Sequence, residues 1–141
     1  MDCPACKGVV VVVEHERIEI DYCTKCFGVW LDAGELELLL ERLALDGSAF
    51  AMDVLMSLPA QEVAEKARPC PICRKKMSKV LVGAQPVVLI DVCSRGHGLW
   101  LDSGELHRII EQVVSVDPRA IDKESKVVAF LGKVFKAVRY P

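Results

Sequence analysis

The residues of this sequence whose types and spacing can do chemistry are its cysteines. In the first half, two pairs with two residues between their members, Cys3 with Cys6 and Cys23 with Cys26, are separated by sixteen residues. Each pair can form a knuckle that presents two thiolates, and a hairpin between the pairs would bring the four sulfurs together as a tetrahedron. This donor set suits a structural zinc ion, so we predict a four-cysteine zinc site in this half.

The second half carries a variant of the same pattern. Cys70 and Cys73 form a pair of the same spacing, but Cys93 is followed by Gly96 and His97 where the first half has its fourth cysteine. Flanking glycines allow the longer knuckle to turn, so we predict a site of three cysteines and one histidine, closed by His97. The alternative is that His97 is an ordinary loop histidine and that this site is empty. His15 and His107 lie outside both patterns and are not predicted as ligands.

Other chemistries remain open for these cysteines. Free cysteines are often simply buried, and four thiolates also suit an iron centre of the rubredoxin kind. Catalytic zinc sites keep an open coordination position, whereas both predicted sites are closed by four protein ligands, which argues against an enzyme. A site of three thiolates and water would arise only if His97 swung away.

A duplicated module organises the chain. Residues 20–36 return as residues 90–106, each with Trp-Leu-Asp-x-Gly-Glu-Leu at its end, and the Cys-Pro-x-Cys of residues 3–6 returns at 70–73. Each spacer has two valine- and isoleucine-rich stretches separated by a polar break or a turn, and Ile18 and Ile20 alternate with polar neighbours, which is typical of β-hairpins. We expect strands at 9–13 and 17–21 and again at 80–82 and 87–92. Amphipathic patterns predict helices at about 33–45 and 103–114.

The residues at the end of each repeat have structural interpretations. Trp30 and Trp100 are expected to fill the small cores between hairpin and helix. The carboxylates Asp32 and Asp102 are expected to cap the helices, together with the glutamates three residues further on, Glu35 and Glu105. These four carboxylates are therefore not predicted to form an acid–base pair.

The predicted fold class is small α+β: two tandem zinc ribbons, each a β-hairpin with two knuckles followed by a helix. The expected divisions are a four-cysteine ribbon with its helix at 1–47, a helical linker at 48–68, a ribbon of three cysteines and one histidine with its helix at 69–116, and a C-terminal amphipathic helix at 117–141. The linker is expected to form two short helical turns broken at Pro59. The last helix would pack on a ribbon or another subunit, or alternatively lie on a membrane surface.

Each copy resembles the transcription-factor-IIB-type zinc-finger family of small zinc ribbons. The resemblance rests on Cys-Pro-x-Cys, a spacer, and a Cys-x2-Cys-x-Gly-x-Trp-Leu-Asp-x-Gly-Glu-Leu segment, and it covers roughly residues 1–45 and 69–115. It implies two zinc ions on the ligand positions given above, with Gly96 and His97 as the departure in the second copy. The family's name implies transcription, but a shared fold does not transfer function.

Charge is uneven along the chain. Residues 1–47 contain ten acidic and four basic side chains, whereas the second half leans basic. A uniform nucleic-acid-binding surface is therefore excluded, because phosphate contacts need a basic face. The candidate phosphate-binding residues all lie near the second predicted zinc site: Arg68, Arg74, Lys75, Lys76, Lys79 and Arg95.

Three function classes follow. The first is a non-enzymatic, zinc-binding adaptor that binds a protein partner or itself and has no small-molecule substrate. The second is a nucleic-acid-associated transcriptional regulator that uses the basic patch of the second ribbon. The third is a redox or zinc-responsive switch in which oxidation of thiolates releases metal. The sequence has no long apolar run and no basic, apolar leader at its start, so we expect a cytoplasmic protein that does not span a membrane.

Overall fold

Both predicted hairpins are present in the computed structural model, which describes residues 1–141 except 16, 43–44, 65–66, 84–86 and 117–141. The first hairpin pairs β1 (Val10–His15) with β2 (Ile18–Cys23), and the second pairs β4 (Ser78–Val82) with β5 (Val88–Val92). In β2 the apolar residues Ile18 and Ile20 are buried and Glu19 between them is exposed. This alternation is what a strand with one covered face requires.

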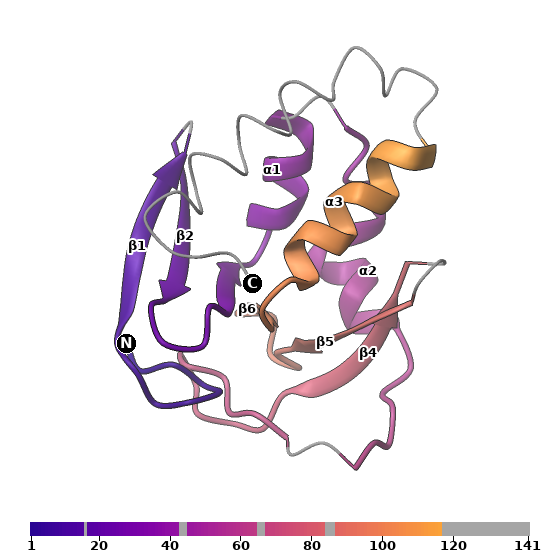
Figure 1. Ribbon diagram of the computed structural model, residues 1–141. Helices are drawn as coiled ribbons and strands as arrows, with labels where there is room; N and C mark the ends of the chain where they lie inside the picture. The colour runs from indigo at the N-terminus through magenta and orange to yellow at the C-terminus, as the bar shows by residue number, and fades with distance from the viewer. Residues whose placement is uncertain (16, 43–44, 65–66, 84–86, 117–141) are drawn as a thin grey trace.

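Two further strands join the ribbons into one sheet. The Trp-Leu-Asp segments form β3 (Val29–Asp32) and β6 (Gly98–Leu101), which pair with each other in antiparallel fashion with Trp30 opposite Trp100. The strand order is β1-β2-β3-β6-β5-β4, so the duplicated halves meet at the centre of a six-stranded sheet (Figure 1). These two strands were not among the predicted elements.

The helices begin later than predicted, and their caps differ in detail. The first, α1, spans Glu35–Arg42 and the other, α3, spans Glu105–Val116; each follows a glycine with φ of 85°. Glu35 accepts a hydrogen bond from the backbone N–H of Asp32, as a capping box requires. The Asp32 carboxylate instead accepts the indole N–H of Trp30 at 2.9 Å, so it holds the tryptophan rather than the helix end.

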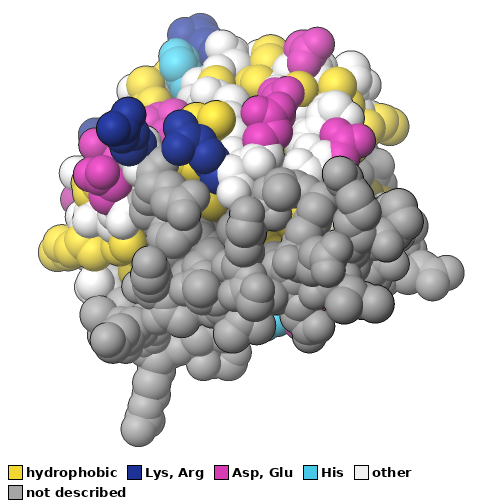
Figure 2. All heavy atoms as spheres, turned by 90° about the horizontal axis from the view of Figure 1, so that it is seen from above, with side chains coloured by type: hydrophobic (Ala, Val, Ile, Leu, Met, Phe, Trp, Pro, Cys, Tyr) yellow, Lys and Arg dark blue, Asp and Glu magenta, His cyan; other side chains and the backbone are white. Residues whose placement is uncertain are grey.

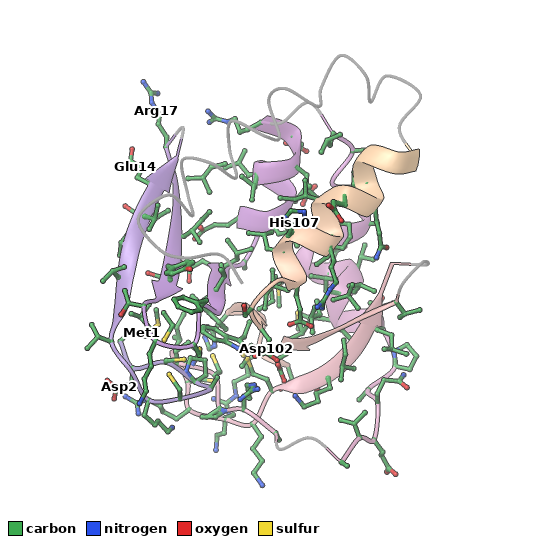
Figure 3. All side chains as sticks on the ribbon, in the orientation of Figure 1. Met1, Asp2, Glu14, Arg17, Asp102 and His107 are labelled. Carbon is green, nitrogen blue, oxygen red and sulfur yellow. The ribbon has the colours of Figure 1, made fainter. Side chains whose placement is uncertain are left out.

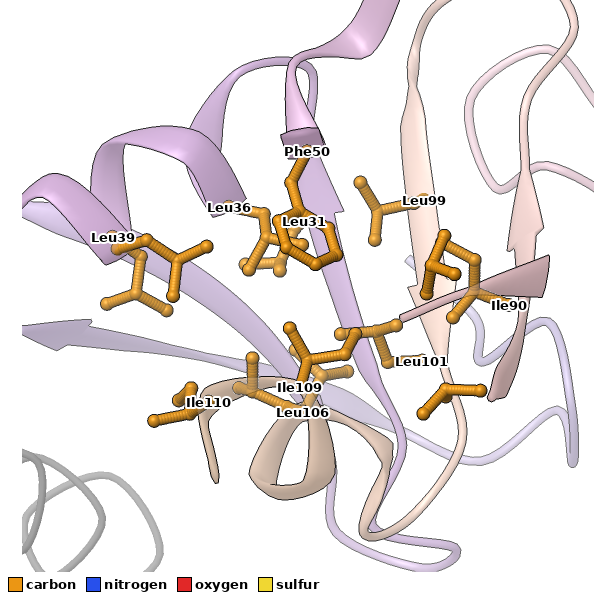
Figure 4. Close-up of a cluster of buried hydrophobic side chains, with 14 of the residues drawn as sticks. Leu31, Leu36, Leu39, Phe50, Ile90, Leu99, Leu101, Leu106, Ile109 and Ile110 are labelled. Carbon is orange, nitrogen blue, oxygen red and sulfur yellow. The ribbon is translucent and has the colours of Figure 1, made fainter. Parts of the chain in front are cut away.

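One hydrophobic core serves both halves of the repeat. The apolar faces of α1 and α3 meet the same side of the sheet, with Leu36 and Leu39 from one helix and Ile109 and Ile110 from the other in a single buried cluster (Figure 4). Burial of large aliphatic side chains contributes about 1.5–3 kcal/mol each. Sharing one core therefore gives two small ribbons a stability that neither would have alone.

The linker departs from prediction in where its helical turns lie. Its two short turns, η1 (Ser48–Phe50) and α2 (Met52–Ser57), are separated at Ala51, and both precede Pro59. They anchor Phe50 and Leu55 in the shared core. Beyond Pro59 the chain runs beside β4, where the Gln61 N–H donates to the Lys79 carbonyl at 2.7 Å.

The predicted C-terminal amphipathic helix at 117–141 lies outside the described residues. Among the residues that the structure describes, no helix combines the length and the apolar character needed to cross a bilayer.

Candidate metal centres

Each knuckle is a tight turn in which backbone N–H groups point at a cysteine sulfur. In the first, Ala5 and Cys6 donate to Cys3 Sγ at 3.3 and 3.4 Å, and Lys7 donates to the Cys3 carbonyl at 3.0 Å. The turn requires Lys7 to adopt a φ of 65°, in the left-handed region. The same bonding recurs around Cys23, so the hairpin delivers two preformed thiolate pairs to one place.

The four cysteines of the first ribbon converge as a tetrahedral site. Cys3 Sγ lies 3.6 Å from Cys26 Sγ, and Cys6 Sγ lies 3.5 Å from Cys23 Sγ. A zinc ion with bonds of about 2.3 Å to four sulfurs would place the sulfurs roughly 3.8 Å apart. The observed separations fit this geometry closely.

The second ribbon brings His97 to the fourth position. Cys73 Sγ lies 3.8 Å from Cys93 Sγ, and His97 Nδ1 lies 3.4 Å from the same Cys93 sulfur. The ligand atoms of Cys70, Cys73, Cys93 and His97 all lie within 4.8 Å of one another. The extra residue in this knuckle is absorbed by Gly96, which has a φ of 81°.

The surroundings of the thiols show why a cation belongs between them. Burial raises the pKa of Cys70 to about 11 and also raises the pKa of Cys3. The backbone N–H of Lys75 helps to lower the pKa of Cys73 to about 7, and backbone N–H groups outweigh burial to lower the pKa of Cys23 to about 7. Without metal, each site would hold a mixture of thiols and thiolates. Zinc replaces the protons and allows all the sulfurs to be thiolates.

The structure also places the other predicted site residues. His107 is paired with Glu111 on α3, 2.5 Å away, and is no ligand; the side chain of His15 is outside the described set. Arg74, Lys75, Lys76 and Arg95, four of the predicted phosphate-binding residues, are exposed in the second ribbon.

Two members of that patch are turned inward, which corrects the prediction. Lys79 is only 5% exposed, and its ammonium lies 2.8 Å from Asp91. Arg68 lies 3.2 Å from Asp102 and 3.9 Å from Asp91. A buried cation next to a carboxylate is costly to extract, so Lys79 is held within the second ribbon, and the partly exposed Arg68 is paired there as well.

Sequence reasoning missed this internal ion-pair network, and also the tryptophan–aspartate bonds. The Trp100 indole donates to the Asp102 carboxylate at 2.9 Å, as Trp30 does to Asp32. The signal was the i, i+2 spacing of Trp and Asp, which places both side chains on one face once the segment is a strand. Lys79 and Asp91 are likewise cross-strand partners.

Two knuckled hairpins, each gathering four zinc ligands and leading into a strand and a helix, define a protein with two tandem zinc ribbons. The family model described as "Transcription factor zinc-finger" matches residues 2–42 and 69–112 as two separate segments. The chain belongs to this family, and it carries two zinc sites. No curated protein and no solved structure gave a significant match to the chain.

Replacing His97 with alanine should lower the zinc content from two ions per chain to about one. Three thiolates would remain at the second site, and second-site affinity depends on a complete donor set. Metal analysis of the purified chain after dialysis against a mild chelator measures this. His97→Cys, which restores a fourth donor, is the matched control and should keep two ions. Two tightly held zinc ions in His97→Ala would show that His97 is not a ligand.

Proposed function

We propose that this chain is a non-enzymatic zinc-binding adaptor that works by binding protein. The observation that carries the proposal is the closure of both metal sites, each of which has four protein donors and none left for substrate. A zinc ion with four protein ligands is normally structural. In this chain the two ions would hold the hairpins of a shared sheet whose outer surfaces are available to a partner.

The described surface suits a protein partner better than a polyanion. Figure 2 shows acidic, basic and apolar side chains interspersed on one face rather than a basic field. Several apolar side chains are also exposed, among them Val9 and Val12 in the first ribbon and Ile72 and Val87 in the second. Mixed surfaces with apolar anchors are characteristic of protein interfaces.

A transcriptional role through nucleic acid is the second candidate, and one observation favours it. The exposed Arg74 lines a small cavity together with Lys7 and Asp2 of the first ribbon, so the first knuckles of the two ribbons lie next to each other and both contribute a basic residue. Lys75, Lys76 and Arg95 extend this group. With Arg68 and Lys79 held in ion pairs, the group is smaller than the sequence indicated.

Two measurements separate these functions. For an adaptor, the zinc-loaded full chain should capture a defined protein from cell extract in a fixed ratio, and the capture should survive nuclease treatment. It should not be retained on random DNA or RNA columns at about 50 mM salt, where phosphate contacts are strong. Retention that is lost on replacing Arg74, Lys75 and Lys76 with glutamine would favour the nucleic-acid role and contradict the adaptor.

A further inference from the structure

The two edges of the six-stranded sheet are not equivalent, although the duplication makes them counterparts. At the β4 edge the outward carbonyl of Lys79 accepts the Gln61 N–H. Val12 holds the same position in β1, because it lies opposite Asp21 as Lys79 lies opposite Asp91. Within the part of the chain that the structure describes, no backbone donor reaches the Val12 carbonyl.

The hydrogen-bonding pattern of the first hairpin shows which backbone groups of β1 face away from β2. Thr24 donates its N–H to the Val9 carbonyl, so Val9 and every second residue after it bond toward β2. The residues between them therefore turn their N–H and C=O groups to the open side of β1. A bridge between Asp2 and Val9 covers the beginning of this side. Beyond the bridge, Val12 and Glu14 present the backbone groups that an added strand would pair with.

Over its run of valines, this edge lacks the proline and the lysine that often keep an exposed strand from pairing. Val9 is 69% exposed, Val12 is 60% exposed and Val11 is 39% exposed. Residues 9–13 are five valines in succession, with no proline and no lysine. Exposed edges are normally blocked by charge, by proline or by a covering segment, so an apolar edge of this kind is suited to a partner.

The outer face beside the edge carries acidic side chains, and one of them, Asp21, has a counterpart in the second ribbon that is paired with a lysine. Asp91 there has Lys79 at 2.8 Å, whereas in the first ribbon Asp21 faces Val12. The carboxylates Glu14 and Glu19 lie directly opposite each other at the next cross-strand position on the same face. None of the ion pairs among the described residues involves these carboxylates.

We propose that the open edge of β1 binds an extended segment of a partner protein, one that alternates basic and apolar residues and adds to the sheet as a seventh strand. Basic side chains on the outer face would lie beside Glu14 of β1 and would extend across β1 toward Glu19 and Asp21 of β2. On the opposite face of the sheet, apolar side chains of the added strand would pack beside Val11. This inference rests on the proposed adaptor function and names its docking surface; strand addition is a common mode of peptide recognition.

A second copy of this chain is the less suitable occupant. Pairing β1 with the β1 of another molecule would bring two sets of the same carboxylates, Glu14, Glu19 and Asp21, to one short interface. Like charges across paired strands are destabilising. Glu14 and Arg17 lie at the hairpin tip, at the opposite end of β1 from Met1 and Asp2 (Figure 3), so the N-terminal bridge, among the described residues, covers only the end of β1 away from the tip.

The test uses a nine-residue synthetic peptide of alternating lysine and valine, blocked at both ends, titrated into the zinc-loaded full chain. The peptide should slow amide hydrogen exchange at Val12 and Glu14, and binding should weaken as salt is raised. A peptide with glutamate in place of lysine should not bind. Neutralising Glu19 and Asp21 together, by E19Q and D21N, should weaken binding about tenfold.

Two further variants keep the result specific. Val12→Pro removes an outward N–H without touching the bonds to β2, and it should abolish binding while zinc content stays at two ions. Neutralising the exposed Glu41 and Glu62 instead is the matched charge control and should leave binding unchanged.

Three outcomes would overturn the proposal: no binding, binding that ignores the E19Q/D21N change, or amides of Val12 and Glu14 already protected in the free chain. The last would mean that the chain itself or a second copy occupies the edge. Since the peptide test needs no natural partner, failure of the adaptor capture experiment and failure of this edge remain separate results.

Discussion

Removing both zinc ions with a strong chelator is expected to unfold the whole sheet in one cooperative transition, not the first ribbon alone. Cys3, Cys23, Cys70 and Cys93 are buried in a single cluster with Trp30 and Trp100, which spans both halves. A structural zinc ion contributes about 10–16 kcal/mol in small zinc-binding peptides. A domain of this size is stable by about 5–15 kcal/mol in total. Loss of even one ion would therefore remove most of the free energy of unfolding of the domain that the two halves form.

The coupling between the ribbons can be tested by breaking only one site. Cys23→Ser removes a donor of the first site and leaves the second intact. Backbone amide signals of β5 and β6 should then be lost together with those of β1 and β2, and the far-ultraviolet circular dichroism should fall toward that of the chelated chain. Ser94→Ala, at an exposed position in the second ribbon's knuckle, is the control and should behave like the unchanged chain. Native signals from β4, β5 and β6 in Cys23→Ser would contradict the shared core.

The metal sites and hairpins were predictable because their information is local. Cys3 and Cys6 belong to one knuckle whatever the rest of the chain does, and the alternation around Ile18 and Ile20 indicates a covered strand. The role of His97 as a ligand could also be predicted, since the repeat aligns it beside the position of Cys26. Gly96 then accounts for the extra residue of the turn.

The pairing of β3 with β6, which joins the two ribbons, was not predictable from such local signals. Strands β3 and β6 have four residues each, too few to show a period, and their tryptophans are equally suited to the approach to a helix. Their pairing depends on which segment of the other copy lies opposite. The same is true of Lys79, whose charge indicated a phosphate-binding patch but whose strand register buries it against Asp91.

Gly98→Ala is expected to destabilise the protein by about 3 kcal/mol, at the upper end of the usual cost of overpacking. A Cβ at Gly98 would lie 2.3 Å from the Leu31 carbonyl oxygen and 2.7 Å from the Trp30 ring. The ring could shift, but the carbonyl belongs to β3, where Asp32 is paired with Gly98. Gly28 is the counterpart, with Trp100 ring carbon Cζ2 2.1 Å from an added Cβ. In each ribbon a glycine thus leaves room for a tryptophan near the junction of the two ribbons. Gly98→Ala should therefore disrupt the pairing of β3 with β6 at the centre of the sheet.

Chemical denaturation of the zinc-loaded chains measures this effect, and Gly34→Ala provides the comparison. Gly34 has no atom within 4 Å of an added Cβ, but its φ is 85°. That substitution should therefore cost only the backbone strain of a left-handed residue, about 1 kcal/mol. The excess cost in Gly98→Ala reports on the contact between the ribbons, provided that both variants retain two zinc ions. Equal stability of the two variants would mean that β3 and β6 do not meet as the structure shows. A large excess would establish that the duplicated ribbons fold as one unit through their paired tryptophans.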